Sequence, residues 1–359
     1  MKITYIAETS LTNKSAYTHH VLKMCDAFSK KGKVQLIIPY FRKNLNFKKI
    51  KKFFLLTSKK DILMKSILHS KVNNFLYRIL FGYKCAVYLK NKDSNIIISR
   101  SIISSFFLSC FKINHFLEIH SEFVGLTKFL MINLDYVNSK YILKTILISK
   151  SLSKKLSTIK KKKLLILHDA VDINNFKYKK KNKKIKSISY VGSFHKGKGI
   201  ELVLKLAKRF KKLRFNIYGD PLGNVYKISK NVKIHGYINY NKVPKVLANS
   251  DLLLLPSANI QYGRSTRTNI ANYNSPLKMF DYLAAGRIIV SSKRDGICEI
   301  LKHNYNSIIV DQYNSRDWEK SINKLLNNKY NLVKLRNNSI ATAKKFTWDK
   351  RVDIILNAQ

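Results

Sequence analysis

Residues 2–39 read KITYIAETSLTNKSAYTHHVLKMCDAFSKKGKVQLIIP, and this stretch decides the fold class. Its apolar residues predict a strand at Lys2–Ala7, followed by a polar loop at Glu8–Ser15. Apolar side chains then recur at helical spacing across Ala16–Lys31. A second apolar strand is predicted at Val34–Pro39. The order strand, helix, strand is that of a βαβ unit and indicates the start of a parallel sheet.

The same alternation continues along the chain. In the first half we predict further strands at Ile96–Ser99, Phe116–Ile119, Thr145–Ile148 and Leu164–Leu167. In the second half we predict strands at Ile188–Val191, Arg214–Tyr218, Val232–His235, Leu252–Leu255, Ile288–Ser291 and Ser307–Val310. Helices are predicted between them at Ile200–Phe210, Val243–Asn249, Pro276–Ala285 and Ile297–Leu301, and two or three amphipathic helices end the chain.

The two series of strands are separated by a polar segment at Val171–Ser187. It contains the lysine-rich run Lys177–Lys184, whose self-repulsion favours a linker or an exposed edge. We therefore expect an α/β chain of two doubly wound, Rossmann-like domains facing across a cleft, at 1–170 and 171–345. Residues 346–359 are expected to form a helix that packs back on the first domain. Ligands of such sheets bind at the carboxyl ends of the strands.

The composition is that of a globular chain with an unusual charge. The 359 residues are 45% hydrophobic and carry a formal net charge of +49. Such a field concentrates anions, although part of the lysine excess also fits a base-composition bias. The four cysteines form no C-x-x-C pair, which indicates a reducing, cytoplasmic location without disulfides or zinc. We expect no signal peptide and no membrane span, because Arg100 and Lys112 interrupt the most apolar stretch.

The segment Asn274–Gly286, NSPLKMFDYLAAG, is the strongest candidate site. Ser275 is expected to be the N-cap of a helix and Pro276 its first residue. The free N–H groups of the first turn attract anions, and Lys278 adds a full charge. Asp281 lies three residues further on the same face, where its carboxylate could accept the hydroxyl groups of a ribose. An ordinary amphipathic helix with a solvated Lys and Asp explains the segment equally well.

A second candidate is Tyr190–Gly199, YVGSFHKGKG, between a predicted strand and a predicted helix. The backbone at Gly192 could approach a phosphate closely, and Lys198 could neutralise it. Plain turn chemistry would also explain these glycines. A third candidate, His120, ends a predicted strand of the first domain, although a lone histidine is more often structural. Weaker claims belong to His20, Glu118 and His168.

The chain lacks the common metal-ligand motifs, including the D-x-D pair by which many sugar transferases hold a divalent cation. It also lacks the G-x-S-x-G and H-E-x-x-H motifs. We therefore expect neither a metal nor another cofactor. Lysine side chains and helix dipoles would then stabilise a leaving diphosphate.

Taken in order, these motifs resemble the GT-B-fold retaining glycosyltransferases of glycosyltransferase family 4, in particular a bacterial surface-polysaccharide branch. The similarity extends over nearly the whole chain. It rests on Lys14-Ser-Ala-Tyr, Leu117-Glu-Ile-His120, Leu167–Phe176, Gly192 with Lys198-Gly199, Ser250–Pro256, Tyr262-Gly263-Arg264, Ser275-Pro-Leu-Lys, Ala284-Ala-Gly286, Glu299 and Phe346-Thr-Trp348.

The resemblance implies roles for single residues. His120 and Lys198 would be catalytic, with His120 beside the transferred sugar and Lys198 on the diphosphate. The other donor-binding residues would be Gly192, Gly236, Tyr237, Ser275, Leu277, Lys278, Asp281 and Glu299. The chain departs from the family where a pair of glutamates is usual, since Tyr273 and Asp281 hold those positions. It also has no glycine in the loop Glu8–Ser15.

The resemblance implies a hexosyl- or other glycosyltransferase of the EC 2.4 class. It would move a sugar from a nucleoside-diphosphate donor to a saccharide or lipid-linked acceptor, with retention, in the synthesis of cell-surface polysaccharide or lipopolysaccharide. An anionic inner membrane is a possible partner, and specific nucleic acid is not expected. Two alternatives remain open: a sugar-nucleotide epimerase of the same fold, which would need carboxylates in the cleft, and a non-enzymatic anion or nucleic-acid binder.

Overall fold

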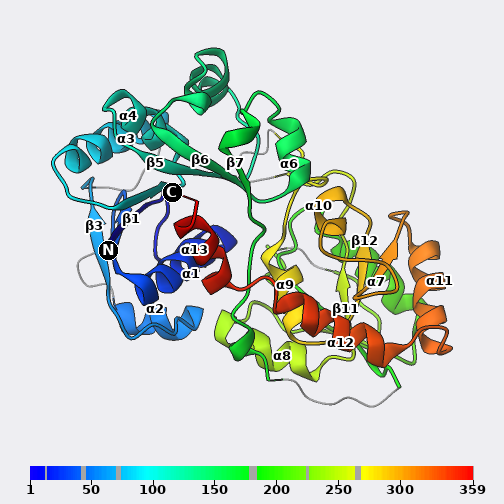
Figure 1. The fold of residues 1–359 in the computed structure, drawn as a ribbon. Coiled ribbons are helices and arrows are strands. Elements are labelled where there is room, and N and C mark those ends of the chain that lie inside the picture. Colours follow the sequence, from blue (N-terminus) through cyan, green and yellow to red (C-terminus); the bar gives the residue numbers. More distant parts are fainter. Residues whose placement is uncertain are drawn as a thin grey trace. The chain divides into compact units, whose positions relative to one another are not determined.

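The computed structural model describes residues 1–12, 14–41, 46–69, 74–177, 184–223, 226–262 and 268–358. The chain divides into two compact units (Figure 1). Unit 1 comprises Met1–His168 together with Trp348–Gln359, and unit 2 comprises Asp169–Thr347. Most of the lysine-rich run at 177–184 and part of the turn at 262–264 lie outside the described residues.

Unit 1 is built on a parallel sheet of seven strands in the order β3-β2-β1-β4-β5-β6-β7. The strands are β1 (Lys2–Ile6), β2 (Lys33–Ile38), β3 (Ile62–Ser66), β4 (Ile96–Ser99), β5 (His115–Ile119), β6 (Ile142–Leu147) and β7 (Leu164–Ile166). Ile3 of β1 lies opposite both Val34 of β2 and Ile96 of β4. The strand order therefore reverses between β1 and β4, and ligands of doubly wound sheets bind at such a switch point.

The helices of unit 1 are α1 (Ala16–Lys31), α2 (Phe47–Phe54), α3 (Phe75–Lys90), α4 (Ile102–Cys110), α5 (Leu126–Lys128), α6 (Lys150–Lys155) and α13 (Trp348–Leu356). Short η turns lie at Phe129–Asn133, Tyr136–Asn138 and Lys161–Lys163. The last helix, α13, lies beside α1, and the ion pair of Lys30 with Asp349 joins the two at 2.7 Å (Figure 1). Chain ends that are far apart in sequence thus complete one unit.

Unit 2 is a second parallel sheet, of six strands in the order β10-β9-β8-β11-β12-β13. The strands are β8 (Ser187–Val191), β9 (Arg214–Tyr218), β10 (Val232–Ile234), β11 (Leu252–Leu255), β12 (Ile288–Ser292) and β13 (Ile308–Val310). The helices are α7 (Ile200–Arg209), α8 (Val243–Asn249), α9 (Leu277–Ala284), α10 (Asp295–Cys298), α11 (Ser315–Leu326) and α12 (Leu332–Ala343), with η turns at Ile173–Asn175 and Tyr240–Lys242.

The fold is thus the expected pair of Rossmann-like domains. In unit 2 each face of the sheet supports its own apolar cluster. Leu252 and Leu254 of β11 belong to one cluster, and Leu253 and Leu255 belong to the other. A strand that is apolar on both faces is typical of a sheet covered by helices on both sides.

Two predicted helix starts were wrong. The helix predicted at Ile297–Leu301 is α10, which begins at Asp295, where an acidic side chain suits the first turn. The helix predicted from Pro276 begins at Leu277, and Pro276 is its N-cap. Ser275 therefore does not cap α9 as expected, because it lies one residue too early for its hydroxyl to reach the orphan N–H groups.

Candidate functional site

The candidate site of unit 2 lies at the switch point of its sheet, beyond the carboxyl end of β8. The loop after β8 packs tightly on the loop after β9: the Gly192 N–H donates to the Tyr218 carbonyl at 2.9 Å. A Cβ atom at Gly219 would lie only 2.0 Å from the Gly192 carbonyl oxygen. The Gly219 N–H in turn donates to the Gly236 carbonyl, again at 2.9 Å. These contacts hold three successive strand-end loops in one rigid edge.

Lys278, near the start of α9, extends its side chain into this edge. Its Nζ lies 4.3 Å from the centre of the Tyr190 ring. A Cβ atom at Gly192 would lie 2.9 Å from the same Nζ, so the absence of a side chain there makes room for the ammonium group. The Tyr190 hydroxyl donates to the Ser193 carbonyl at 2.7 Å and lies 3.3 Å from the Lys198 carbonyl oxygen. Tyr190 therefore joins Lys278 to the Gly192–Lys198 loop.

The two lysines of this edge are charged groups in a poorly solvated position. Burial, together with the nearby charge of Lys198, lowers the pKa of Lys278 to about 7. Burial also lowers the pKa of Lys198 to about 8. Within the part of the chain that the structure describes, neither ammonium group has a hydrogen bond or an ion pair. Two cations held together without a counter-charge form a site for an anion.

Asp281 lies one turn further along α9 and is buried. Its Oδ1 accepts a hydrogen bond from the Tyr240 hydroxyl at 2.9 Å. The next residue, Tyr282, fixes α9 to β8, because its hydroxyl accepts from the Val191 N–H at 2.9 Å. The carboxylate is thus held on the same helix as Lys278, next to a phenol that sequence reasoning did not single out.

Ser275 precedes α9 and is buried, with 1% of its surface exposed. Among the described residues its Oγ has no hydrogen-bond partner. A buried hydroxyl without a partner is costly, and Ser275 lies three residues before Lys278, so its role as a ligand group stays a prediction. Leu277, the first residue of α9, is half-buried.

The remaining candidates of unit 2 lie on other elements. Gly236 follows β10 with a φ of 69°, a left-handed conformation, and Tyr237 beside it is exposed. The neighbouring Tyr218 ring stacks on His235 at 4.3 Å between ring centres, which gives this edge a flat aromatic surface. Glu299 is the C-cap of α10 and is half-buried. Their roles toward a ligand stay predictions.

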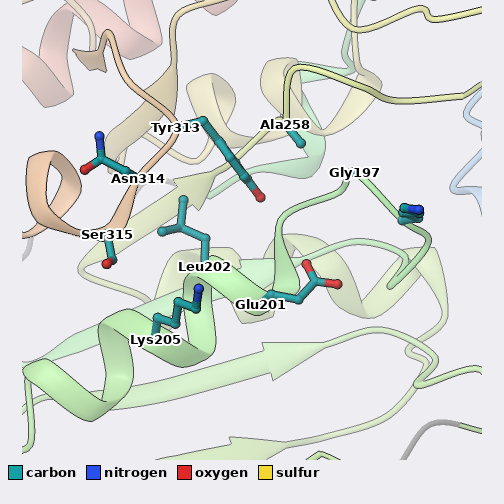
Figure 2. Close-up of a pocket in the computed structure, with 9 residues that line it drawn as sticks. Gly197, Glu201, Leu202, Lys205, Ala258, Tyr313, Asn314 and Ser315 are labelled. Carbon is teal, nitrogen blue, oxygen red and sulfur yellow. The ribbon is translucent and has the colours of Figure 1, made fainter.

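A pocket of about 290 Å³ lies beside the Gly192–Lys198 loop. Its wall is formed by the start of α7, by Ala258 and by the segment after β13, where Tyr313 projects toward Glu201 and Gly197 (Figure 2). The full lining is Lys196, Gly197, Glu201, Leu202, Lys205, Ala258, Tyr313, Asn314 and Ser315. None of the donor-binding residues predicted from the sequence lines it, so it adjoins the lysine pair rather than containing it.

In unit 1, His120 directly follows β5 as predicted, and it belongs to a buried cluster around Glu118. The Glu118 Oε1 lies 2.7 Å from His20 Nε2, 3.0 Å from His120 Nε2 and 2.7 Å from Arg351 Nη2 of α13. The Tyr5 hydroxyl donates to the other carboxylate oxygen. Although burial raises it, the charges of His20 and Arg351 hold the pKa of Glu118 well below its usual range.

The surroundings of His120 determine its protonation state. Burial, together with the nearby charge of Arg100, lowers the pKa of His120 to about 3. Its imidazole is therefore neutral near pH 7, and its Nε2–H donates to Glu118 when that tautomer is present. Sequence reasoning gave Glu118 and His20 only weak claims and did not include Arg351, which lies 233 residues from Glu118.

Arg100 is a second residue that sequence reasoning missed. It directly follows β4, at the switch point of the unit 1 sheet, and its guanidinium carbon lies 4.1 Å from the centre of the Tyr17 ring. In the described ranges, its Nε and Nη1 are buried without a hydrogen-bond partner. The neighbouring carboxylate of Glu8 is already taken by Arg78 and Ser101, each at 2.6 Å. The strand-end position was the available signal for Arg100, as it was for His120.

Comparison with known proteins agrees with this description. Residues 171–346 match the family described as "Glycosyl transferases group 1". An uncharacterized glycosyltransferase of Methanocaldococcus jannaschii is 23% identical over 172 residues, which are 45% of this chain and 44% of that protein. An uncharacterized 41.2 kDa protein of the cps region of Klebsiella pneumoniae is 28% identical over 205 residues, 53% of this chain and 52% of that one. The matches thus span about half the length of each relative.

Solved structures extend the likeness to the whole fold. The crystal structure of Anabaena HepE in complex with UDP-glucose superimposes with a TM-score of 0.71, at 12% identity and over 100% of both chains. At this identity the likeness concerns the fold alone, which is that of the GT-B proteins. The family match in unit 2 and this fold together support a glycosyltransferase.

Proposed function

Because residues 171–346 match the family described as "Glycosyl transferases group 1", we propose that the protein transfers a sugar from a nucleoside-diphosphate donor to a saccharide or lipid-linked acceptor. The observation that carries the proposal is the unpaired couple of Lys198 and Lys278 at the switch point of unit 2. A diphosphate supplies the counter-charge that both ammonium groups lack. The UDP-glucose held by HepE, a protein of the same fold, is a donor of this class.

The lysine pair also suits the chemistry of the reaction. When the bond from the anomeric carbon to the diphosphate breaks, negative charge develops on the leaving oxygen, and preorganised cations there stabilise the transition state. The N–H groups at the start of α9 add to this field. Cationic side chains thus take the place of a divalent metal, and we propose that transfer proceeds without one. No group is assigned as a covalent nucleophile, and we propose retention with attack from the face of the departing diphosphate.

Asp281 is proposed to accept hydrogen bonds from the ribose of the donor. It lies one turn beyond Lys278 on α9, and its Oδ1 accepts a hydrogen bond from Tyr240. The flat surface of Tyr218 and His235, with Tyr237 beside it, is proposed for the nucleotide base, because aromatic faces stack on bases.

Unit 1 is proposed to hold the acceptor, with His120 near the transferred sugar. The guanidinium of Arg100 at its switch point favours an acceptor that carries phosphate or carboxylate groups. A saccharide on a lipid diphosphate is such an acceptor, and it supports a role in making surface polysaccharide or lipopolysaccharide at the inner face of the cytoplasmic membrane. The cps-region relative fits this role.

The two other functions are less favoured. An epimerase would need carboxylates as acids and bases at the site, and the cations dominate there. A nucleic-acid binder would need a basic face with several stacking aromatics, whereas both tryptophans and many of the other large aromatic side chains are buried in the cores.

A panel of nucleoside diphosphates and sugar nucleotides tests the proposal. A ligand at a hundred times its dissociation constant stabilises the fold by about 2.7 kcal/mol, which thermal unfolding detects. We expect at least one diphosphate to stabilise the protein and the corresponding monophosphate to do so less, because it offers the lysine pair less charge. Stabilisation by none of them, with the protein folded, would refute the donor site.

A further inference from the structure

Helix α3 carries a stripe of exposed apolar side chains on the side opposite its core contacts. Leu76, Leu80, Tyr83 and Val87 follow each other at helical spacing, with 72%, 40%, 46% and 45% of their surfaces exposed. The opposite side of the helix, with Phe81 and Cys85, is fully buried in the core of unit 1. A helix that is buried on one side and apolar on its solvent side presents an unusual surface for a globular protein.

The neighbouring helix continues this surface. Helices α3 and α4 lie side by side (Figure 1), and they approach closely at Gly82, where a Cβ would lie 2.9 Å from Cγ2 of Ile103. The Tyr83 ring contacts Phe107 and Phe111, with ring centres 5.8 and 5.9 Å apart. We call the exposed side chains Leu76, Leu80, Tyr83 and Val87, with the half-buried Phe107 and Phe111, the α3–α4 patch.

Lysine side chains lie beside the patch. From residue 62 to residue 117 the sequence contains eight basic residues and one acidic residue, and of the basic residues Arg78 pairs with Glu8 while Arg100 lies at the switch point of the sheet. That acid, Asp93, is paired with Lys2 at 2.9 Å. Lys90 lies 6.0 Å from the centre of the Phe111 ring, and Lys92 lies 5.6 Å from that of Tyr88. An apolar surface with aromatic side chains and neighbouring cations is complementary to a lipid bilayer with anionic headgroups.

We propose that the α3–α4 patch docks the protein on an anionic lipid membrane, with its apolar side chains in the interface and its lysines at the headgroups. Charge decides between this occupant and a second copy of the chain, because two surfaces of the same sign repel each other and each chain carries a net charge of +49. Every helix in the described part of the chain is too short or too polar to span a bilayer.

The patch differs from the lysine runs of the chain, such as Lys160–Lys163, which could make only ionic contacts with a membrane. Of the run Lys160–Lys163, the last ammonium group donates to the carbonyls of Ser139 and Ile142 and is not available to a lipid. A purely ionic attachment through such runs would be reversed fully by salt. Attachment through the patch keeps an apolar part that salt does not screen.

Sedimentation with lipid vesicles tests the docking. We expect the protein to bind phosphatidylcholine vesicles containing about one-third phosphatidylglycerol much more strongly than phosphatidylcholine alone, with only partial release by salt. Replacing Leu76, Leu80 and Val87 together with Gln should weaken the binding about tenfold or more. The matched control replaces Ile260, Val333 and Ile354 with Gln. These residues are 54%, 53% and 45% exposed, and the variant should bind vesicles like the unaltered protein.

A reporter shows whether the patch itself enters the lipid. Trp318 and Trp348 are buried, so a Tyr83→Trp variant places a single exposed indole on the patch. Its emission should shift to the blue on vesicles and be quenched by lipids brominated in their acyl chains. Equal binding by the unaltered and triple-Gln proteins, an unshifted emission in the bound state, or equal binding to neutral vesicles would each overturn the proposal. So would self-association that the triple substitution abolishes, because it would make a second copy the occupant.

Membrane docking and sugar transfer are tested by independent measurements, so one proposal can be refuted without the other. Vesicle binding is measured without any sugar nucleotide, and the triple-Gln variant is expected to keep the nucleoside-diphosphate affinity of the unaltered protein, since α3 contributes nothing to the lysine pair of unit 2.

Discussion

The Nζ of Lys278 lies 4.3 Å from the centre of the Tyr190 ring, so this half-buried lysine faces an aromatic ring and, among the described residues, no carboxylate. A cation over a ring is stabilised only by about 0.5–2 kcal/mol, less than burial of the charge costs. The pKa of Lys278 accordingly falls to about 7. Lys198 adds a second positive charge nearby without an accompanying carboxylate.

The first prediction removes one charge of this pair. Lys278→Met or Lys198→Met should weaken nucleoside-diphosphate binding by about 1.5–3 kcal/mol, the usual worth of a hydrogen bond to a charged group. Calorimetric titration measures the loss. Lys196→Met, an exposed lysine in the same loop, is the control and should change the affinity little. Undiminished affinity in folded Lys278→Met protein would show that the anion binds elsewhere.

A second prediction follows from the lowered pKa values of about 7 for Lys278 and about 8 for Lys198. A bound diphosphate favours the charged ammonium groups and raises both pKa values, so binding takes up protons above pH 7. The affinity should therefore fall as the pH rises from about 7 to 9. Calorimetry in two buffers of different ionisation enthalpy measures the proton uptake directly. Proton release on binding, or an uptake unchanged by Lys278→Met, would contradict the lysine pair as its source.

In the absence of ligand, the Lys278→Met protein also shows whether the charge of Lys278 destabilises the fold. The folded pKa of Lys278 lies below its ordinary value of 10.5, so the unfolded chain binds more protons and stability rises with pH above 7. The substitution should thus stabilise the ligand-free fold more at pH 6 than at pH 9.

Two elements of unit 2 show that local sequence patterns predict secondary structure in this chain. The helix Val243–Asn249 and the strand Leu252–Leu255 have the bounds that the pattern predicts. Pro244 in the first turn and a four-leucine run mark them locally. The grouping of Gly192, Lys198 and Lys278 followed from motifs at strand ends, because parallel strands bring such loops to one edge.

What sequence did not predict depends on contacts between distant residues. Glu118 lies in an apolar strand and could not be matched to Arg351 by spacing, since their contact requires α13 to complete unit 1. Arg100 was read only as a break in an apolar stretch. Its significance rests on the absence of partners for its Nε and Nη1 among the described residues, which only the folded chain reveals.

The third prediction concerns metal. If the lysine pair neutralises the departing diphosphate, transfer should persist in excess chelator, because the cations are side chains. A radiolabelled-sugar transfer assay with and without EDTA measures this. Complete loss of transfer in EDTA, restored by manganese or magnesium, would rule out the proposed leaving-group mechanism.

The fourth prediction concerns the buried cluster of unit 1. Glu118→Gln leaves the Arg351 guanidinium without its counter-charge, and breaking a buried pair in this way costs about 3–5 kcal/mol. Because the pKa of Glu118 is lowered, its contribution to stability is present at neutral pH and is lost as the pH falls through that low value. Urea unfolding at pH 7 and at successively lower pH values down to about pH 2 should therefore show a smaller acid dependence in the variant. Glu122→Gln, at a half-buried glutamate of the same segment, is the control. An equal loss of stability in this variant would contradict a special role of Glu118 as the counter-charge of Arg351.

The last prediction tests Asp281, where the chain departs from the family it resembles. Asp281 Oδ1 already accepts the Tyr240 hydroxyl at 2.9 Å, so the proposed ribose contact shares a carboxylate with a protein donor. An aspartate also reaches about 1.5 Å less far than a glutamate. Asp281→Asn should weaken binding of a ribonucleoside diphosphate more than of its 2′,3′-dideoxy counterpart, because a group that contacts only the ribose loses nothing when the hydroxyls are absent.

Tyr240→Phe is the matched companion in this calorimetric cycle. It removes one competing donor and keeps the ring, so it should preserve or increase the discrimination between the two nucleotides. Asp281→Asn should abolish that discrimination in the presence or absence of the Tyr240 hydroxyl. If Asp281→Asn instead weakens both nucleotides equally while the fold is retained, Asp281 does not contact the ribose, and its carboxylate serves only to hold Tyr240 against α9.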